Sequence, residues 1–304
     1  MLSVGFVSAI LPDLSFEEVI DFAAEADYAW VELCCWPAGK AERRYAGVTH
    51  LDVADLSDAR IAEVQAYLAE KKVSLSGLGY YPNPLDADAE KAAFYQEHIR
   101  QVIVAASRLG LKNVNTFIGR NQALNEDENL RVFAEVWPPI VKFAAEHGIN
   151  IGIENCPMYF TNDEWPKGQN LAYSPKIWRQ MWEIIPDANF GLNYDPSHLL
   201  WMQMDVCKPL TDYPDRLHHL HLKDAVVHRE KLNDVGILAN PLEYHTPRLP
   251  GRGDIDWGRY FATLESIGWD GPVVLEVEDK NYEATLDDRK RALTETRAFL
   301  RQWV

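Results

Sequence analysis

The sequence has no long hydrophobic run and no recognisable export segment. No stretch approaches the roughly 18 consecutive apolar residues that a membrane-spanning helix needs. Residues 1–20, MLSVGFVSAILPDLSFEEVI, contain neither the basic segment nor the small-residue cleavage site of a signal peptide. We therefore expect a cytoplasmic protein with no membrane partner.

Cysteine is scarce, with four residues in a chain of 304. Cys34 and Cys35 are adjacent, whereas Cys156 and Cys207 lie far from them and from each other. This spacing fits neither a disulfide framework nor a zinc ribbon. We expect reduced thiols, as is usual in the cytoplasm.

Positive charge is also in short supply. The chain has 30 Lys and Arg against 46 Asp and Glu, so its formal net charge is −16. An acidic surface repels phosphate backbones, which makes nucleic acid an unfavourable partner. Net charge says little about a small substrate, because a local site can have either sign. Hydrophobic residues make up 47% of the chain, which supports a large core and argues against disorder.

The sequence does contain a regular alternation of short apolar runs and longer amphipathic segments. The apolar runs predict eight strands, at residues 2–8, 29–35, 73–80, 112–119, 150–156, 190–196, 217–224 and 272–279. Helical periodicity predicts helices at 15–26, 58–72, 90–110, 129–148, 175–185, 256–268 and 286–303, with the weakest pattern at 201–212. Gly110, Gly148 and Gly268 follow three of these helices, where C-terminal glycines are common.

Strands and helices that alternate in this way form parallel sheets with helical crossovers. Eight such units close into a (β/α)8 TIM barrel, the α/β fold that we predict as a single domain over residues 1–304. An open doubly wound sheet is the alternative, but it requires a glycine-rich turn after the first strand. The turn here, SAILPDLS, has no glycine. The long loops 157–174 and 225–255 follow the fifth and seventh strands, so we expect both at the C-terminal face, where barrels build their sites.

Four successive strands carry a polar residue near their C-terminal ends. These are Glu154 in IGIEN, Asp195 in NYDPSH, His221 in HLHLKD and Glu276 in VVLEVED. Each of them alone is as well explained by a buried polar group that a neighbour satisfies. Together, three carboxylates aimed at one mouth repel each other unless a cation is present, so we predict a site for one divalent metal ion. Oxygen-rich ligation with one imidazole suits Mn²⁺ best, with Mg²⁺, Co²⁺ and Zn²⁺ as alternatives.

These motifs resemble the xylose-isomerase-like superfamily of TIM barrels, the sugar phosphate isomerase/epimerase group. The resemblance spans essentially the whole chain and includes PGRGDIDW and GPVVLEVE. The group contains ketose 3-epimerases, inosose isomerases and dehydratases, and apurinic endonucleases. The resemblance implies that the four strand-end residues hold the metal and that Glu154 and Glu276 also form the acid/base pair. It further implies that His198 contacts a substrate oxygen and that the subunits form a homo-oligomer.

The chemistry of such a site can also be argued from the residues themselves. A metal chelated by two adjacent substrate oxygens polarises a carbonyl and stabilises the enediolate that follows proton loss. If Glu154 and Glu276 face the substrate from opposite sides, one removes a proton and the other returns it, which gives epimerisation. Return to the neighbouring carbon gives aldose–ketose isomerisation, and a leaving group β to the carbonyl gives elimination.

Two departures from the family pattern keep other functions open. The epimerase branch carries an Arg six residues after the metal-binding His, but this chain has Val227 there. The endonuclease branch carries an Asp-x-His pair that binds further zinc ions, and Glu243 and His245 repeat it imperfectly. Glu32 is a further candidate ligand for such a cluster, or else an inward polar group satisfied by a neighbour.

Several other residues are candidates for substrate binding. Lys223 shares a strand face with His221, so it could hold a substrate oxygen or steady the enediolate, or simply extend to solvent from the strand end. His245 is predicted to bind substrate or transfer a proton, unless it is a solvated loop residue. Arg252 stands beside glycines at a helix start, where it could bind an anion or pair with Asp254.

Aromatic residues and one asparagine complete the predicted site. Loop 157–174 contributes four aromatic residues near the mouth: Tyr159, Phe160, Trp165 and Tyr173. We predict that Trp165 stacks on the substrate and helps to exclude water, unless the loop is only a packed lid. Asn115 is predicted to line the pocket wall.

The sequence therefore favours a metal-dependent sugar isomerase or epimerase with a small-molecule carbohydrate substrate. The first alternative is a lyase or hydrolase acting on oxidised sugars such as 3-keto-glycosides or inososes. An apurinic endonuclease is disfavoured by the net charge and by the lack of an evident zinc cluster. A non-enzymatic binding protein would need no acid/base pair, so Glu154→Gln and Glu276→Gln would leave its function intact.

Overall fold

The computed structural model describes residues 2–38, 47–159 and 164–304, and its centre is a closed barrel. Eight parallel strands follow one another in the order β1, β10, β7, β6, β5, β4, β3, β2. Their bounds are Val4–Val7 (β1), Trp30–Cys34 (β2), Ser74–Gly79 (β3), Asn113–Thr116 (β4), Asn150–Glu154 (β5), Phe190–Tyr194 (β6), Leu217–Leu222 (β7) and Val273–Leu275 (β10). Strand β1 pairs with both β10 and β2, which closes the ring. The predicted TIM barrel is confirmed, and the open doubly wound sheet is excluded.

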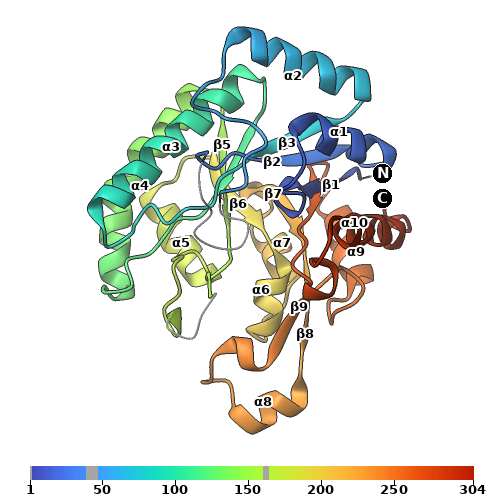
Figure 1. Cartoon of the computed structure of the whole chain (residues 1–304). Helices are drawn as coiled ribbons and strands as arrows, with labels where there is room; N and C mark the ends of the chain where they lie inside the picture. Colours follow the sequence, from blue (N-terminus) through green and yellow to red (C-terminus); the bar gives the residue numbers. More distant parts are fainter. Residues whose placement is uncertain (1, 39–46, 160–163) are drawn as a thin grey trace.

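Helices connect the strands and form the outer layer of the molecule (Figure 1). They are Phe16–Glu25 (α1), Asp58–Lys71 (α2), Ala89–Arg108 (α3), Glu126–Glu146 (α4), Pro175–Ile184 (α5), Pro196–Trp201 (α6), Lys208–Asp212 (α7), Arg229–Val235 (α8), Trp257–Ser266 (α9) and Leu286–Leu300 (α10). Short 3-10 turns lie at Ser8–Ile10 (η1), Pro214–Arg216 (η3), Pro241–Glu243 (η4) and Lys280–Tyr282 (η5). Two helix starts follow from local sequence, because Ser15 with Glu18 and Asn125 with Glu128 form capping boxes on α1 and α4.

Alternation along the strands separates an apolar outer core from a polar barrel interior. On β7, Leu220 and Leu222 are fully buried and belong to the core that the helices cover. His219, on the opposite strand face, reaches across the barrel, and its Nε2 lies 3.0 Å from Ser76 Oγ on β3. The interior positions near the C-terminal ends of the strands are therefore the ones available for chemistry.

Most predicted elements are present within their predicted ranges. All eight barrel strands lie inside the predicted runs, and the glycines after α3, α4 and α9 adopt positive φ, as expected for helix C-terminal positions. Helix α4 begins earlier than the predicted range 129–148, because Asn125 caps it. The weak helical pattern at 201–212 corresponds to the end of α6 and to a separate short helix, α7.

Segment 225–255, predicted as a loop, mainly forms an arm built on a second sheet, so that prediction was wrong. Strands β8 (Asp224–Val227) and β9 (His245–Arg248) pair antiparallel, with Val227 opposite His245. Helix α8 and turn η4 lie between them, and the whole unit projects from the barrel in orange in Figure 1. We call residues 224–248 the β8–β9 arm. Each strand has only four residues and its partner is distant in the chain, so neither carries a readable sheet pattern.

Asp224 closes the base of the arm. Its two carboxylate oxygens accept four hydrogen bonds of 2.8 to 3.2 Å, donated by the backbone N–H groups of Ala225, Gly251 and Ile255 and by the indole of Trp257. A Cβ atom on Gly253 would lie 2.2 Å from Asp224 Oδ1, so this close approach requires glycine. The arm is thus anchored to the start of α9 by one buried carboxylate.

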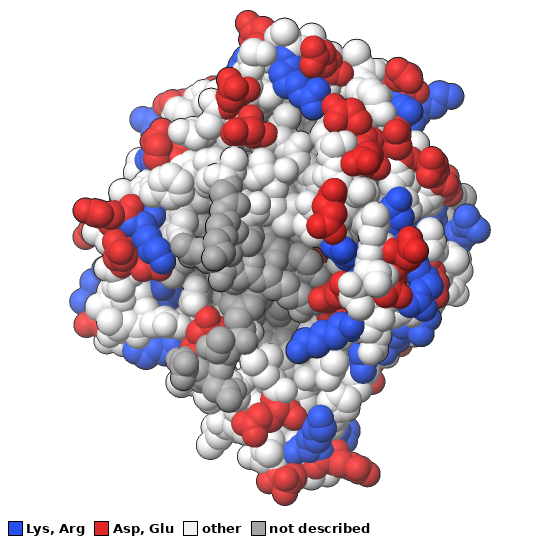
Figure 2. Space-filling model, viewed as in Figure 1, with Lys and Arg blue, Asp and Glu red and all other residues white. Residues whose placement is uncertain are grey.

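The described helices and surface are polar in character. Within residues 2–38, 47–159 and 164–304, every helix is too short or too polar to cross a bilayer. Figure 2 shows acidic and basic side chains intermixed around the periphery of one face. The described part of that face offers no continuous basic surface of the kind that a nucleic acid backbone requires.

Candidate metal centre

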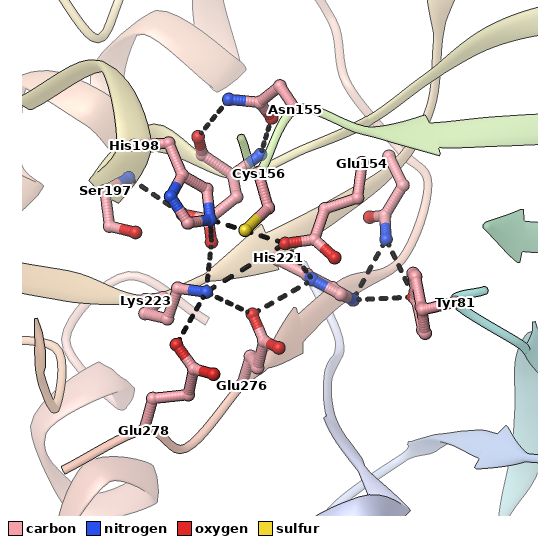
Figure 3. Close-up of polar contacts among 12 residues, drawn as sticks. Tyr81, Glu154, Asn155, Cys156, Ser197, His198, His221, Lys223, Glu276 and Glu278 are labelled. Atoms are coloured by element: carbon pink, nitrogen blue, oxygen red, sulfur yellow. Dashed lines mark hydrogen bonds and ion pairs between the residues drawn. The ribbon is translucent and has the colours of Figure 1, made fainter. Parts of the chain in front are cut away.

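The four predicted metal ligands come together at the C-terminal mouth of the barrel. Glu154 ends β5, Asp195 directly follows β6, His221 lies on β7, and Glu276 directly follows β10. These strands are consecutive around the barrel. Each residue offers one ligand atom, and these atoms all lie within 4.8 Å of one another. Figure 3 shows three of the side chains, those of Glu154, His221 and Glu276, converging on one small volume.

One buried nitrogen indicates that this cluster fits a cation. Nδ1 of His221 makes no hydrogen bond among the described residues, although the side chain is fully buried. It faces Glu276 Oε2 at 3.4 Å and Glu154 Oε1 at 4.0 Å. A buried nitrogen left without a partner costs free energy, and a metal ion held between it and the carboxylates removes that cost. Three carboxylates and one imidazole suit a divalent ion of the Mn²⁺ class.

The other ring nitrogen of His221 is held by Glu32. Nε2 lies 2.8 Å from Glu32 Oε2, and the hydroxyl of Tyr81 donates to the second oxygen, Oε1. Because a carboxylate can only accept, the Nε2 atom carries the proton and Nδ1 keeps its lone pair for a metal. A carboxylate behind a metal-binding histidine is a common second layer of such sites. The structure thus shows Glu32 as an inward group satisfied by its neighbours.

A chain of hydrogen bonds continues from Tyr81 into the barrel. The amide of Asn193 donates to the Tyr81 hydroxyl at 3.1 Å, and Asn193 Oδ1 accepts from His219 Nδ1 at 2.9 Å. Burial lowers the pKa of His219 to about 3, so this imidazole is neutral and its Nε2 accepts from Ser76. A Cβ atom on Gly79 would lie 2.4 Å from Glu32 Oε1, so glycine makes room for the carboxylate. This network inside the barrel fixes the orientation of the His221 ring.

Lys223 places a buried ammonium group among the carboxylates (Figure 3). Its Nζ lies 2.7 Å from Glu276 Oε2, 2.9 Å from Asp195 Oδ2 and 3.2 Å from Glu278 Oε2. Burial alone would lower the pKa of Lys223, but these carboxylates hold it well above its ordinary value. Four carboxyl groups, those of Glu154, Asp195, Glu276 and Glu278, face this single ammonium, so the surroundings favour a further cation.

The same surroundings push the carboxylate pKa values apart. Burial, followed by the nearby Glu276 carboxylate, raises the pKa of Glu154. Burial acts in the same direction on Asp195, but Lys223 and His198 hold its pKa well below the ordinary range. For Glu276, burial is outweighed by Lys223 and His221, which hold its pKa at about 2. Two carboxylates with opposite shifts are the arrangement that acid/base catalysis uses.

His198 lies at the rim of the donor cluster, on the first turn of α6. Asp195 caps that helix by accepting from Ser197 N at 2.7 Å, which carries the His198 imidazole over the mouth. His198 Nε2 is 3.2 Å from Asp195 Oδ2 and 3.5 Å from Glu154 Oε1. The structure therefore brings His198 together with the predicted ligands. Asn155 supports this geometry because its amide both donates to and accepts from the Asp195 backbone, at 2.8 and 2.7 Å.

His245 belongs to an aromatic cluster beside the mouth. Its ring stacks on Trp201 at 5.1 Å, and its Nδ1 donates to the Pro241 carbonyl at 2.6 Å, which leaves Nε2 as a free acceptor. Burial, helped by the charges of His198 and Lys223, lowers the pKa of His245 to about 4. It is a neutral base at neutral pH.

Trp165 joins the same cluster through Tyr159. The Tyr159 ring lies 5.3 Å from Trp165 and 6.2 Å from Trp201, so the segment after β5 and helix α6 meet here. The other two aromatic residues of loop 157–174 do not join them. Tyr173 donates to Glu126 Oε2 on α4 at 2.9 Å, and Phe160 lies outside the described residues.

Asn115 and Arg252 differ in how they relate to the centre. Asn115 lies on β4 and is fully buried. Neither its amide oxygen nor its amide nitrogen has a hydrogen-bond partner among the described residues, so both atoms can bond to a ligand. Arg252 instead pairs with Glu295 of α10 at 2.6 Å and covers the Tyr282 ring. Arg252 thus pairs with Glu295 rather than with Asp254, the partner considered from the sequence. No contact among the described residues joins Arg252 to the donor cluster.

Glu243 and His245, considered from the sequence as further zinc ligands, join no group of three metal-ligating side chains among the described residues. Glu32, the other candidate, does join one, with His219 and His221. The residues that sequence reasoning missed are Tyr81, Asn193, His219, Cys156 and Glu278. Of these, His219, Cys156 and Glu278 carried a readable signal, because each lies two residues from a predicted ligand along the same strand or its continuation.

Known proteins resemble this chain in sequence. The family described as Xylose isomerase-like TIM barrel matches residues 20–303. Among characterised and uncharacterised relatives, the YfiH protein of Bacillus subtilis is 25% identical over 97% of this chain and 99% of its own length. A ketose 3-epimerase of Arthrobacter globiformis is 29% identical over 44% of this chain and 36% of its own. An inosose dehydratase of Glaesserella parasuis is 27% identical over 56% of this chain and 57% of its own.

Solved structures share the fold at lower sequence identity. The IolI protein, crystallised with a bound zinc atom, superposes with a TM-score of 0.73 at 15% identity, over 100% of this chain and 99% of that one. A D-psicose 3-epimerase superposes with a TM-score of 0.72 at 14% identity, over 99% of each chain. The match to the named enzymes among the sequence relatives covers less than two thirds of their length.

Proposed function

This chain belongs to the xylose isomerase-like TIM barrel family, and we propose that it is a metal-dependent enzyme that enolises a keto-sugar or a related keto-cyclitol. One observation carries the proposal. Glu154 and Glu276 stand with Asp195 and His221 in one buried donor cluster, so one cluster offers both metal ligands and proton carriers. The ketose 3-epimerase and inosose dehydratase relatives both act on substrates of this class by their names.

The metal is proposed to be a single divalent ion, with Mn²⁺ as the first choice. The ligands would be Glu154, Asp195, His221 through Nδ1, and Glu276. When bound, the ion would polarise the substrate carbonyl and stabilise negative charge on its oxygen. The zinc atom in the IolI structure supports a divalent ion but not its identity.

The protein groups supply the proton transfers. Glu276, held ionised by Lys223 and His221, takes the proton from the carbon next to the carbonyl. Glu154, whose pKa is raised, returns a proton from its protonated form. Delivery to the opposite face of the same carbon gives the epimer, and delivery to the neighbouring carbon gives the aldose–ketose isomer. His198 Nε2 is proposed to hold a substrate oxygen at the rim.

Lys223 is the observation that favours a second candidate, a dehydratase. Its ammonium lies 2.7 Å from the proposed base, Glu276, so it can protonate a hydroxyl that leaves from the carbon β to the carbonyl. In that reaction the C–H bond breaks toward Glu276, the C–O bond breaks, and the oxygen departs as water with a proton from Lys223. His245 also favours the dehydratase. It lies opposite Val227 in the β8–β9 sheet, and Val227 occupies the position where the epimerase branch would carry an Arg.

The test follows proton exchange at the substrate carbon. Metal-loaded protein and a chelated control are incubated in D₂O with ketoses, inososes and 3-keto-glycosides, and the products are followed by NMR. Metal-dependent deuterium incorporation with a new isomer supports the epimerase or isomerase. Exchange with loss of water or of an aglycone supports the lyase. Absence of exchange with every substrate contradicts both. Glu276→Gln should abolish exchange, whereas the matched variant Glu63→Gln, on the exposed face of α2, should not.

Two broader properties are proposed from the family resemblance and the composition. We expect a homo-oligomer in the cytoplasm, with no nucleic acid or membrane partner. Size-exclusion chromatography with light scattering tests the oligomer, and a monomer at micromolar concentration contradicts it.

A further inference from the structure

A second group of metal-ligating side chains adjoins the donor cluster. Cys156 follows β5 by two residues, beside Glu154 at the strand end and His198 on α6. The four cysteines all lie among the described residues, and Cys156 is the one that is partly exposed, whereas Cys34, Cys35 and Cys207 are buried. Cys156 is therefore set apart from the other three, and its thiol lies beside Glu154 and His198 at the mouth of the barrel.

The geometry of this trio is that of a binding site. The ligand atoms of Glu154, Cys156 and His198 lie within 4.8 Å of one another. Figure 3 shows the Cys156 sulfur between the His198 imidazole and the Glu154 carboxylate. Nε2 of His198 makes no hydrogen bond among the described residues, although only 9% of its side chain is exposed. Its contacts are the ion pairs with Asp195 and Glu154, at 3.2 and 3.5 Å. Imidazole, carboxylate and thiol therefore converge on one volume, which a soft cation fits.

The backbone holds the thiol in place. Met158 N donates to Cys156 Sγ at 3.3 Å, which requires the chain to turn back on itself after Pro157. Met158 adopts a φ of +60° to do so, a left-handed conformation that is unfavourable for a non-glycine residue. The turn holds the sulfur beside Glu154 and His198.

We propose that Glu154, Cys156 and His198 bind a second divalent cation of the thiophilic class, such as Zn²⁺ or Cd²⁺. Thiolate, imidazole and carboxylate are the ligands that zinc takes in proteins, and three of them leave a fourth position open. The first cluster has no sulfur and favours harder ions of the Mn²⁺ class. On binding, the metal–sulfur bond forms as the S–H bond breaks, and the proton passes to solvent.

The two ions would share Glu154, because its Oε1 lies 3.5 Å from His198 Nε2 and 4.0 Å from His221 Nδ1. An ion on His198 removes that imidazole from any substrate. We therefore expect Zn²⁺ or Cd²⁺ to inhibit an enzyme that Mn²⁺ activates. This inhibition rests on the proposed function, whereas the binding site itself does not, so the test below uses binding alone.

The experiment titrates Cd²⁺ into Mn²⁺-loaded protein and records the ultraviolet charge-transfer band of a cadmium–thiolate bond. The band should appear with one equivalent, and dialysis with elemental analysis should find one Cd²⁺ per chain that Cys156→Ser lacks. Cys207→Ser, a matched change at a buried cysteine, should keep the band. His198→Asn should weaken Cd²⁺ binding at least tenfold.

A variant of the first cluster separates the two sites. His221→Asn should lose Mn²⁺ but keep the cadmium–thiolate band, because it leaves the trio intact. Loss of the band in His221→Asn would mean that the sulfur serves the first ion and no second site exists. Retention of the full band in Cys156→Ser would equally overturn the proposal. Neither result depends on whether any sugar is turned over.

Discussion

The dependence of metal binding on Glu32 is a sharp prediction of the structure. The two oxygens of this carboxylate each receive one proton donor, Nε2 of His221 at 2.8 Å and the hydroxyl of Tyr81. In Glu32→Gln the side chain keeps its shape but offers one oxygen and one NH₂ group. One of the two donors then faces another donor. Either His221 loses its support or Tyr81 must rotate away.

The expected magnitude follows from the role of this carboxylate. Removing the partner of a metal-bound histidine costs about 10- to 100-fold in metal affinity, which is about 1.4 to 2.7 kcal/mol. We expect the upper end, because Glu32 is fully buried and its negative charge also attracts the cation. Burial alone would raise the pKa of Glu32, but His221 keeps it lowered, so the charge is present at neutral pH.

The assay measures Mn²⁺ affinity by competition with a chelator of known affinity. The visible spectrum of the Co²⁺-loaded protein gives a second readout, because a reoriented imidazole changes the ligand field whereas a general loss of stability does not. Tyr81→Phe is the matched control. It keeps the carboxylate and removes one donor, so we expect at most a tenfold loss. A Glu32→Gln affinity within twofold of the native value, with an unchanged Co²⁺ spectrum, would refute the reasoning.

Other predictions test separate parts of the structure. Lys223→Met should lower the rate of water elimination by about 10²- to 10⁴-fold if the ammonium is the general acid, yet tighten Mn²⁺ binding because a competing positive charge is removed; weaker Mn²⁺ binding would contradict the charge argument. Burial, helped by Arg216, lowers the pKa of His218 from 6.5 to about 4. As the pH falls, His218 is therefore protonated in the unfolded chain before it is protonated in the folded one. Stability is complete above pH 6.5 and falls as the pH drops toward 4, by about 3 kcal/mol for this group. Urea unfolding of His218→Gln across this range should show a shallower decline, and an identical decline would contradict it. Asp224→Asn places an NH₂ group against N–H donors and should destabilise the fold by about 3 kcal/mol in urea unfolding; a change below 1 kcal/mol would mean that the base of the arm is held elsewhere. Chelation should abolish deuterium exchange and added Mn²⁺ should restore it, whereas exchange that persists in the chelated protein would remove the metal from the mechanism.

The metal-donor cluster was predictable because position on a parallel strand determines position in a barrel. Glu154, Asp195, His221 and Glu276 each stand where an apolar run ends, and all such ends meet at one mouth. Nothing beyond the alternation of strands and helices was needed to bring them together. The same logic identified Lys223, which lies two residues beyond His221.

The supporting residues follow no such rule. Tyr81 and Asn193 act through contacts across the barrel interior, between strands that are far apart in sequence. A polar residue facing inward looks the same in the sequence whether it orients a ligand or fills space, which is why Glu32 had two open interpretations. Arg252 was read from its neighbours, yet its partner Glu295 is 43 residues away. Local sequence contains no sign of such a pairing.

The β8–β9 arm is anchored at both of its ends, so the segment between these ends can be exchanged. Asp224 gathers donors from both ends of the excursion, and Asp254 accepts from Val227 N at 2.8 Å, so the chain is clamped before it leaves the barrel and again as it returns. Segments between Val227 and His245 can therefore be exchanged for others of different length without disturbing the strand order. The arm is thus a graft site beside the donor cluster, where the surroundings of a substrate could be changed while the four proposed metal ligands stay in place.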